Sequence, residues 1–203
     1  ATEEQVVDPR PAIGRDRNQP ARRRLVELFE VEGDVRDDPG GYVDAARAIA
    51  SEFIESGPVY WEEYADGRQE PTNTLGNGLA TDPAIRVAVL INGGSASASE
   101  ILAGALQDSG RGTLIGERSF GKGTIQQWHQ LSGESGGFRL SIAKWLTPNQ
   151  TWVHGTGITP NEVVSMPGDT PTSEDPQLDR ALEILSAGPG SSTTPVESSA
   201  ASP

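Results

Sequence analysis

A serine and a lysine 25 positions apart are the chain's best candidates for chemistry. Ser97 is the middle serine of residues 95–99 (SASAS), and Lys122 lies between two glycines in residues 120–123 (FGKG). A lysine amine can take the proton of a serine hydroxyl once burial lowers its pKa from about 10.4 to about 7 or 8. The pair therefore predicts a Ser-Lys nucleophile and base, which cleaves an amide bond without a metal or cofactor.

The serine lies between a predicted strand and a predicted helix. Residues 87–91 (VAVLI) are an apolar run short enough to be a buried strand covered on both faces. Gly93 and Gly94 permit a sharp turn, and apolar residues at helical spacing then run from Glu100 to a stop at Gly110. At this junction, free backbone amides and the helix dipole would stabilise an oxyanion.

Each candidate also has an ordinary structural interpretation. A serine before a helix is more often a cap than a nucleophile, and we interpret Ser95 as a cap and Ser99 as a helix-facing residue. A lysine in a glycine turn is usually a solvated loop residue. It is the spacing between the serine run and the FGKG run that favours catalysis by Ser97 and Lys122.

Two other motifs fail on inspection. Residues 116–123 (GERSFGKG) are one residue from the phosphate-binding loop G-x-x-x-x-G-K-[ST], but Gly123 replaces the hydroxyl and a strand-like pattern follows. A Ser-His-Asp hydrolase would need G-x-S-x-G, which the serine run lacks, and His129 and His154 lie in strand-like or turn-like stretches. A nucleotide hydrolase and a histidine-based triad are therefore disfavoured.

The sequence around Ser97 and Lys122 resembles a known family. Residues 87–127, continued by FRLSIAKWLTPN and GTGITPNEVV, are similar to the carboxyl-terminal processing peptidases, also called tail-specific proteases. Residues 35–54 resemble that family's R-x-N-P-G-G turn and the helix after it. The resemblance implies a serine endopeptidase that cleaves proteins near their C-termini. It also implies an α/β, crotonase-like (ClpP/crotonase) core, with a mixed sheet flanked by helices.

The same resemblance implies roles for individual residues. Ser97 would be the nucleophile, Lys122 the general base, and Gln126 the residue that positions the lysine. Ala98 and Gly41 would supply the two amides of the oxyanion hole. No cofactor and no metal is implied.

Three features leave the family pattern incomplete or open. Asp108 matches an acidic position implicated in some members, but a turn-forming role is equally compatible with its place before Gly110. Residues 25–35 (LVELFEVEGDV) carry acidic residues where the family has an apolar strand, and the strand and helix before it are missing, so we expect a core partly truncated at its N-terminus. This leaves an alternative, in which the chain is a catalytically impaired, peptide-binding relative with an incomplete oxyanion hole.

Composition indicates one globular domain with polar ends. The 203 residues are 34% hydrophobic, with 24 glycines and 15 prolines. We expect a disordered segment over 1–24, the catalytic core over 25–187, and a disordered Ser/Pro-rich tail over 188–203. A net charge of −13 disfavours nucleic acid, and two distant histidines with no cysteine make a zinc site improbable. Polypeptide tails are the expected partners.

The remaining expectations concern location and the other elements. Residues 1–24 contain no apolar run, so we expect neither a signal peptide nor a membrane span there, and no PDZ domain is visible. The resemblance implies an extracytoplasmic location, in the periplasm or cell envelope, for the full-length protein. The patterns predict the following elements: helices at 42–55 and 176–187, a strand at 59–64, a polar loop at 65–83, and a hairpin of 124–130 with 137–146.

Overall fold

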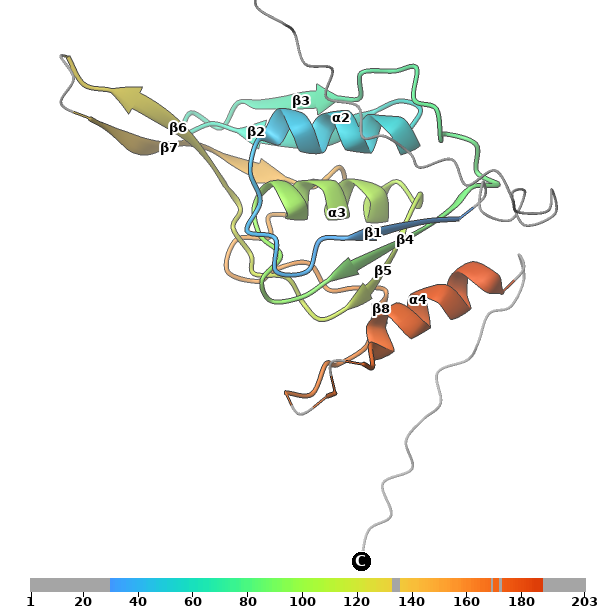
Figure 1. Ribbon diagram of the computed structural model, residues 1–203. Coiled ribbons are helices and arrows are strands. Elements are labelled where there is room, and N and C mark those ends of the chain that lie inside the picture. Colours follow the sequence, from blue (N-terminus) through green and yellow to red (C-terminus); the bar gives the residue numbers. More distant parts are fainter. Residues whose placement is uncertain (1–29, 133–135, 169, 172, 188–203) are drawn as a thin grey trace, which may run out of the picture.

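The computed structural model describes residues 30–132, 136–168, 170–171 and 173–187, which form an α/β core with two sheets (Figure 1). The segments expected to be disordered, 1–24 and 188–203, lie outside these residues. One sheet is entirely parallel and the other entirely antiparallel. The α/β class is therefore confirmed, while the strands expected in one mixed sheet are divided between two.

The parallel sheet contains the strand that leads to the serine run. Its order is β1 (Glu30–Asp34), β4 (Arg86–Ile91), β5 (Thr113–Gly116) and β8 (Glu162–Val163). After its first residue β4 is buried throughout, as expected for a strand covered on both faces. Within the stretch 25–35 that departs from the family pattern, residues 30–34 form β1, at one edge of this sheet, and residues 25–29 lie outside the described residues.

Helices cover both faces of the parallel sheet (Figure 1). α2 (Val43–Phe53) and α3 (Ala98–Asp108) lie on the side of the antiparallel sheet, and α4 (Pro176–Ser186) lies on the opposite side. Successive side chains of a strand point to opposite faces. The two apolar clusters follow this rule, since Val87, Val89 and Ile91 pack toward α3 whereas Ala88 and Leu90 pack toward α4. The helices predicted at 42–55 and 176–187 are thereby confirmed.

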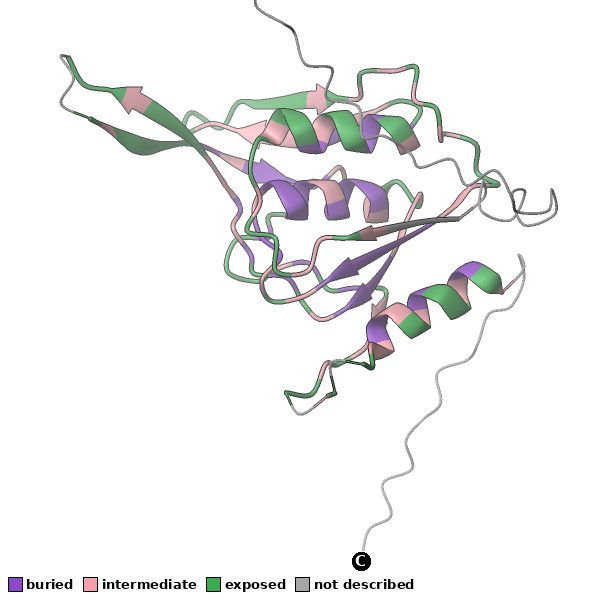
Figure 2. Cartoon of the chain, in the orientation of Figure 1, coloured by how far each residue is buried: buried purple, intermediate pink, exposed green. Residues whose placement is uncertain are grey.

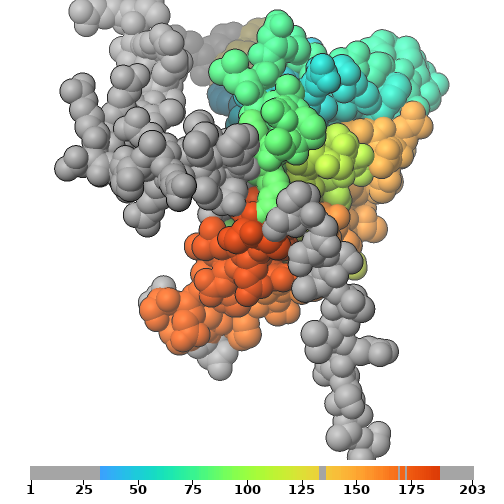
Figure 3. Space-filling model, turned by 90° about the vertical axis from the view of Figure 1, so that its right-hand side faces the viewer, coloured from blue at the N-terminus to red at the C-terminus, as the bar shows by residue number. Residues whose placement is uncertain are grey.

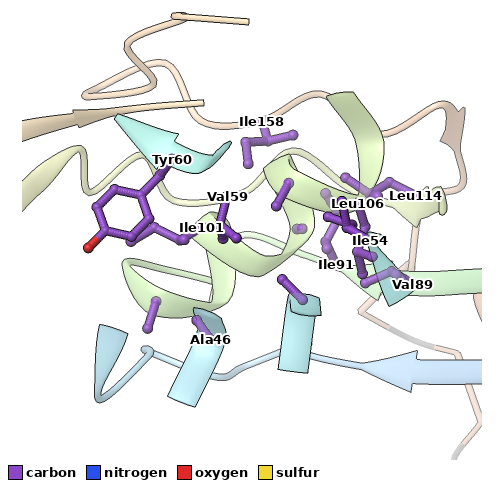
Figure 4. Packing of buried hydrophobic residues seen from close by; sticks show 14 of the residues in the cluster. Ala46, Ile54, Val59, Tyr60, Val89, Ile91, Ile101, Leu106, Leu114 and Ile158 are labelled. Atoms are coloured by element: carbon purple, nitrogen blue, oxygen red, sulfur yellow. The ribbon is translucent and has the colours of Figure 1, made fainter. Parts of the chain in front are cut away.

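The main core lies between α2, α3 and the two sheets (Figures 2 and 4). It contains Ile101 and Leu106 of α3, Val59 of β2 and Leu114 of β5. Burying one such side chain stabilises the fold by about 1.5–3 kcal/mol. The helix that begins next to Ser97 is thus held on two sides by the core.

The antiparallel sheet has the order β3 (Gln69–Asn73), β2 (Pro58–Glu63), β7 (Gly137–Leu146) and β6 (Thr124–Gln130). The strand at 59–64 and the hairpin are confirmed. The polar loop predicted at 65–83 is partly wrong, because β3 lies within it and pairs with β2. β3 is an edge strand with mostly exposed residues, so it needs no alternating apolar pattern and its sequence carried no strand signal.

The C-terminal end of α4 lies beside the segment that leads into β4 (Figure 3). There the Arg86 guanidinium donates a hydrogen bond to the Ala187 carbonyl. α4 therefore contacts the parallel sheet along its length and forms, with that face of the sheet, the second apolar cluster. Within the described residues, no helix is long and apolar enough to cross a membrane.

Candidate active site

The turn between β4 and α3, residues 92–97, is called here the serine turn. The Asn92 amide donates to the Ser95 hydroxyl at 3.0 Å, and that hydroxyl donates to the Val35 carbonyl at 2.7 Å. The interpretation of Ser95 as the helix cap was therefore wrong, because its side chain joins the turn to the segment after β1. The N-cap position of α3 belongs to Ser97.

Ser97 has an unusual backbone conformation. Its φ is 59° and its ψ is −117°, so a residue other than glycine occupies the positive-φ region. Such a conformation costs on the order of 1–3 kcal/mol and persists only where surrounding contacts impose it. Ser97 is partly buried, and its amide donates to the Glu100 carboxylate at 2.9 Å. The strained turn fixes the Ser97 backbone directly before the first helical amide.

Residues 35–41, called here the glycine turn, lie against the serine turn. The Ala96 amide donates to the Asp38 carbonyl at 3.0 Å. A Cβ on Gly40, whose φ is +87°, would lie 2.5 Å from the Ala96 carbonyl oxygen and 2.9 Å from the Ser97 Cβ. Only glycine permits this approach, so Gly40 brings the turn that contains Gly41, the expected oxyanion donor, against the proposed nucleophile.

The backbone amides of Gly41 and Ala98, which are expected to bind the oxyanion, differ from the amide of Gly40 in their hydrogen bonds. The Gly40 amide is already used, because it donates to the Asp38 carboxylate at 2.9 Å. Among the described residues, the amides of Gly41 and Ala98 have no hydrogen-bond acceptor. Ala98 is the first residue of α3, where the amide lacks an acceptor within the helix. This arrangement agrees with the prediction of Gly41 and Ala98, which stays a prediction.

A buried carboxylate joins the serine turn to residues 117–123, called here the lysine loop. Glu100 is fully buried, and its Oε2 accepts hydrogen bonds from the amides of Ser97 at 2.9 Å and Lys122 at 2.8 Å. Its Oε1 accepts from the Gly121 amide at 2.7 Å and from the Ser119 hydroxyl at 2.5 Å. Four donors thus offset the cost of removing this carboxylate from water. Glu100 holds the backbones of the two candidate catalytic residues together.

The lysine loop fits closely against residues 152–157. A Cβ on Gly121 would lie 2.7 Å from the Gly157 nitrogen, and one on Gly123 would lie 2.8 Å from the Trp152 indole nitrogen. The Trp152 indole donates to the Gly123 carbonyl at 2.9 Å. The glycines on either side of Lys122 therefore permit the close backbone approach predicted from the sequence.

The two lysines of the chain differ in their contacts. The Lys144 amine pairs with the Glu63 carboxylate at 2.7 Å and lies over the Trp152 ring. Lys122 is partly buried, and its amine has no hydrogen-bond or ion-pair partner among the residues described. The lysine proposed as the base is thus the one whose amine is uncommitted.

For two other expected site residues, Gln126 and Asp108, the roles in catalysis remain predictions. Gln126 is exposed on β6, next to the irregularity in the β6–β7 pairing, and its side chain has no described hydrogen bond. Asp108, at the end of α3, accepts a hydrogen bond from the Asn149 amide at 2.9 Å. Its carboxylate therefore anchors the turn after β7.

Arg36 connects the glycine turn to α4 through side chains that sequence reasoning did not select. Its guanidinium donates to both oxygens of Asp175, at 2.9 and 2.8 Å, and also pairs with Asp34 at 2.7 Å. The hydrogen bond from Arg36 is the main cause that lowers the pKa of Asp175, and likewise that of Asp34. Asp175 also caps α4, because it accepts from the Leu178 amide at 2.9 Å. The glycine turn is thus fixed to the helix on the far side of the sheet.

Sequence reasoning also missed Glu100 as a functional residue. Residues 97–100 (SASE) match the capping-box pattern S-x-x-E, which places a carboxylate near the amide of the cap residue. That signal predicts the bond to the Ser97 amide. It does not predict the bonds to the lysine loop, which require the folded core. No group of three metal-ligating side chains occurs in the part of the chain that the structure describes.

Comparison with known proteins identifies the family. The profile of peptidase family S41 matches residues 33–164. The chain belongs to this family. It is 39% identical over 159 residues to the carboxyl-terminal-processing protease of Synechocystis sp., covering 76% of this chain and 36% of that protein. It is 45% identical over 139 residues to the carboxy-terminal-processing protease of Bartonella bacilliformis, covering 66% and 30% respectively.

A solved structure agrees with this membership. The photosystem II D1 C-terminal processing protease superposes with a TM-score of 0.64 at 31% identity, over 83% of this chain and 43% of that one. The S41 chain described here thus spans about a third of the length of the curated relatives it matches. The resemblance inferred from Ser97 and the lysine loop is confirmed at the level of the family.

Proposed function

We propose that the chain carries the catalytic region of a serine endopeptidase with a crotonase-like core. It would cleave polypeptides near their C-termini by means of a Ser97–Lys122 dyad. Membership of family S41 and the names of the relatives, which describe carboxyl-terminal processing, support this reaction. The same likeness supports an extracytoplasmic location of the full-length protein, which fractionation of the source cells would test.

The observation that carries the proposal is the shared carboxylate of Glu100. Because the amides of Ser97 and Lys122 donate to the same oxygen, their nitrogens lie within two hydrogen-bond lengths, under about 6 Å. A lysine side chain is long enough to carry its amine across such a gap. The Ser97 hydroxyl and the Lys122 amine can therefore meet at one place.

In the proposed reaction, the Ser97 Oγ attacks the scissile carbonyl while the Lys122 amine accepts the hydroxyl proton. The amides of Gly41 and Ala98 donate to the oxyanion of the tetrahedral intermediate. The lysine then returns the proton to the leaving amine as the peptide bond breaks. Water releases the acyl group by the same steps, with Lys122 again receiving and returning a proton.

The test compares hydrolysis of casein and of a C-terminally tagged peptide by the whole chain and two single variants. We expect Ser97→Ala and Lys122→Ala to lower kcat/KM at least about a thousandfold, because each removes a member of the dyad. Lys144→Ala, at the other lysine, and Ser186→Ala, on the surface of α4, are matched controls that should retain activity.

The alternative is a relative that binds peptides without cleaving them. Equal background hydrolysis by the wild type, Ser97→Ala and Lys122→Ala, together with retained peptide binding, would establish that alternative and reject the dyad. Loss of activity in Lys144→Ala but not in Lys122→Ala would reject the assignment of the base.

A further inference from the structure

Two peptide units flank the Lys122 Cα and set the direction in which its side chain leaves the backbone. In the first unit, the Gly121 carbonyl accepts from the Gly155 amide at 2.9 Å, and the Lys122 amide donates to the Glu100 carboxylate at 2.8 Å. In the second unit, the Lys122 carbonyl accepts from the Trp145 indole at 2.8 Å. The other polar group of the second unit is the amide of the next residue, whose acceptor completes the positioning of the proposed base.

That amide, of Gly123, donates to the Nδ1 atom of the His154 imidazole at 3.3 Å. A ring nitrogen accepts a hydrogen bond only when it carries no proton, so this bond requires a neutral imidazole protonated at Nε2. The ring is stacked on the Trp152 indole, with centroids 5.2 Å apart and an interplanar angle of 21°. The Trp152 indole in turn donates to the Gly123 carbonyl at 2.9 Å. The stacked pair thus holds both polar groups of Gly123.

The bond to His154 is the one among these that mild acid breaks. Imidazole ordinarily changes its charge between pH 5 and 8, whereas carboxyl groups ordinarily ionise below that range and indole and backbone amides do not ionise in it. In the protonated ring both nitrogens are donors. The Gly123 amide then faces another N–H group and has lost its acceptor. Because such an unpaired amide is costly, the peptide unit after Lys122 must shift.

The charged groups around His154 offer its protonated ring no partner. The Lys144 amine of β7 lies 4.6 Å from the centre of the indole on which the imidazole stacks, and it is paired with Glu63 of β2 at 2.7 Å. The Arg118 side chain of the lysine loop passes beside the loop 152–157, since its Cγ would lie 3.1 Å from a Cβ on the glycine at 157. Among the described residues, His154 has no carboxylate partner.

A second effect of protonation works in the opposite direction. A positive charge near a lysine favours the uncharged form of its amine, which is the form that accepts a proton. His154 is exposed, however, so water and salt screen its charge from Lys122. The hydrogen bond to the Gly123 amide is a direct contact and is lost outright. The displacement of the backbone is therefore the larger effect.

We propose that His154 is a positioning residue for the Lys122 base: its neutral imidazole holds the peptide unit after Lys122, and its protonation releases that unit and slows peptide cleavage. The inference rests on the proposed peptidase function and adds a control of that function by pH. His154 acts through the Gly123 amide and makes no contact with the scissile bond in this scheme. The chain then loses activity in mildly acidic surroundings by a route that is separate from the chemistry of the dyad.

The first test measures kcat and KM on one peptide across pH for the whole chain, His154→Asn and His154→Leu. The Oδ1 of asparagine accepts where Nδ1 does but does not titrate. At about pH 8 we expect His154→Asn to stay within about threefold of the wild-type kcat and His154→Leu to lose at least about tenfold, with KM little changed. Because every variant keeps Lys122, the pH dependence of the lysine largely cancels in a ratio of kcat values. The ratio of His154→Asn to wild type should rise at least about tenfold from about pH 8 to about pH 5.5.

The matched control is His129→Asn, the same change at the chain's other histidine, which stacks on Phe138 in the hairpin. Its kcat should stay within about twofold of wild type at every pH. A ratio for His154→Asn that is equally independent of pH, in a chain that cleaves peptides, would overturn the proposal and leave the peptidase function standing. A kcat of His154→Asn at about pH 8 as low as that of His154→Leu would also overturn it, because the acceptor would then not be the reason for the loss.

NMR of the isotope-labelled whole chain separates the positioning contact from catalysis. Long-range proton–nitrogen spectra at neutral pH should show the His154 ring protonated at Nε2, and comparison with His154→Asn assigns its signals. On acidification the Gly123 amide resonance should shift with the same midpoint as the ring, and this shift should be absent in His154→Asn. That result would support the contact even if the wild-type chain cleaved nothing. A ring protonated at Nδ1, or a Gly123 amide that does not follow the ring, would reject it.

Discussion

Around Ser97, three loops from distant parts of the sequence are joined by buried and partly buried hydrogen bonds, whereas the β6–β7 hairpin extends from the core and the residues of its outer part are mostly exposed (Figure 2). In the first region Glu100 and Ser95 are almost fully buried and every polar atom of their side chains is bonded. In the hairpin, Trp128 and Leu140 are about half exposed.

The backbone has a different role in each of the two regions. Oxyanion binding needs amides held in fixed positions, and a buried network provides this because each broken bond leaves an unpaired polar group. The hairpin keeps its backbone paired through the β6–β7 ladder, so its exposed side chains can change at little cost. Substitutions in the first region should therefore reduce both stability and catalysis, and those of the exposed apolar side chains of the hairpin, such as Trp128 and Leu140, should reduce neither.

Among substitutions that leave the Ser97–Lys122 dyad intact, the largest effect is expected from Glu100→Gln. A glutamine has the same shape but presents an NH₂ group to at least one pair of the donors that now share the carboxylate. We expect the free energy of unfolding to fall by about 2–4 kcal/mol. We expect kcat/KM to fall more than about a hundredfold, because a displacement of about 1 Å between the reacting groups is that costly. Urea unfolding and peptide hydrolysis measure the two effects.

The control for this variant is Glu183→Gln, which makes the same change on the surface of α4. It should change the unfolding free energy by no more than about 0.5 kcal/mol. Full activity in Glu100→Gln with unchanged stability would show that the serine turn and the lysine loop are held together by other contacts.

The next largest effect is expected in the glycine turn, where a substitution of Gly40 should reduce activity more than the same substitution of Gly41. Gly40→Ala places a Cβ against the Ala96 carbonyl at a φ of +87°, so the turn must shift, and kcat should fall about a hundredfold. Gly41→Ala meets nothing within 4 Å and should reduce kcat less than about fivefold. Steady-state kinetics of both variants on one peptide measures the two values of kcat. A larger fall in kcat for Gly41→Ala than for Gly40→Ala would contradict the role given to Gly40.

A smaller effect is expected where α4 holds the glycine turn. Asp175→Ser keeps a helix-capping hydroxyl but cannot reach Arg36 with two oxygens. We expect a loss of about 1–2 kcal/mol in unfolding free energy and a modest fall in kcat. Asp179→Ser, an exposed change in the same helical turn, is the control.

The pH dependence of this effect follows from the lowered pKa of Asp175, which is due mainly to its hydrogen bond with Arg36. A carboxyl group whose pKa is lowered by folding stabilises the folded state fully above its unfolded pKa of about 3.9. That stabilisation disappears as the pH falls from there through the folded pKa. The stability difference between wild type and Asp175→Ser should therefore be constant at neutral pH and shrink below about pH 4. A difference that grew on acidification would contradict it.

The sequence predicts the parts of this site that depend on local patterns. The buried strand β4, the glycine hinge and α3 follow from an apolar run, two glycines and a helical period within about 20 residues. The close approach around Lys122 follows from Gly121 and Gly123.

The parts that depend on distant contacts were not predictable in this way. Glu100 has the sequence context of an ordinary first-turn residue, and its function arises only when the lysine loop packs on it. Arg36 bonds to Asp175, which lies 139 positions later, and no local pattern links them. β3 was missed for a related reason. Its residues are mostly exposed, so they lack the alternating apolar pattern by which a strand is recognised in a sequence, and the strand forms through its pairing with β2.

The smallest effect is expected in the hairpin. Leu140→Ser removes an apolar side chain that is 50% exposed and faces Gln127 on β6. Surface changes of this kind usually alter the unfolding free energy by no more than about 0.5 kcal/mol, and the backbone pairing of β7 does not depend on the side chain. Hydrolysis of short peptides should stay within about twofold of wild type, as measured beside Glu100→Gln under the same conditions. A loss in Leu140→Ser comparable to that in Glu100→Gln would mean that the hairpin is held as rigidly as the serine turn, and the contrast between the two regions would fail.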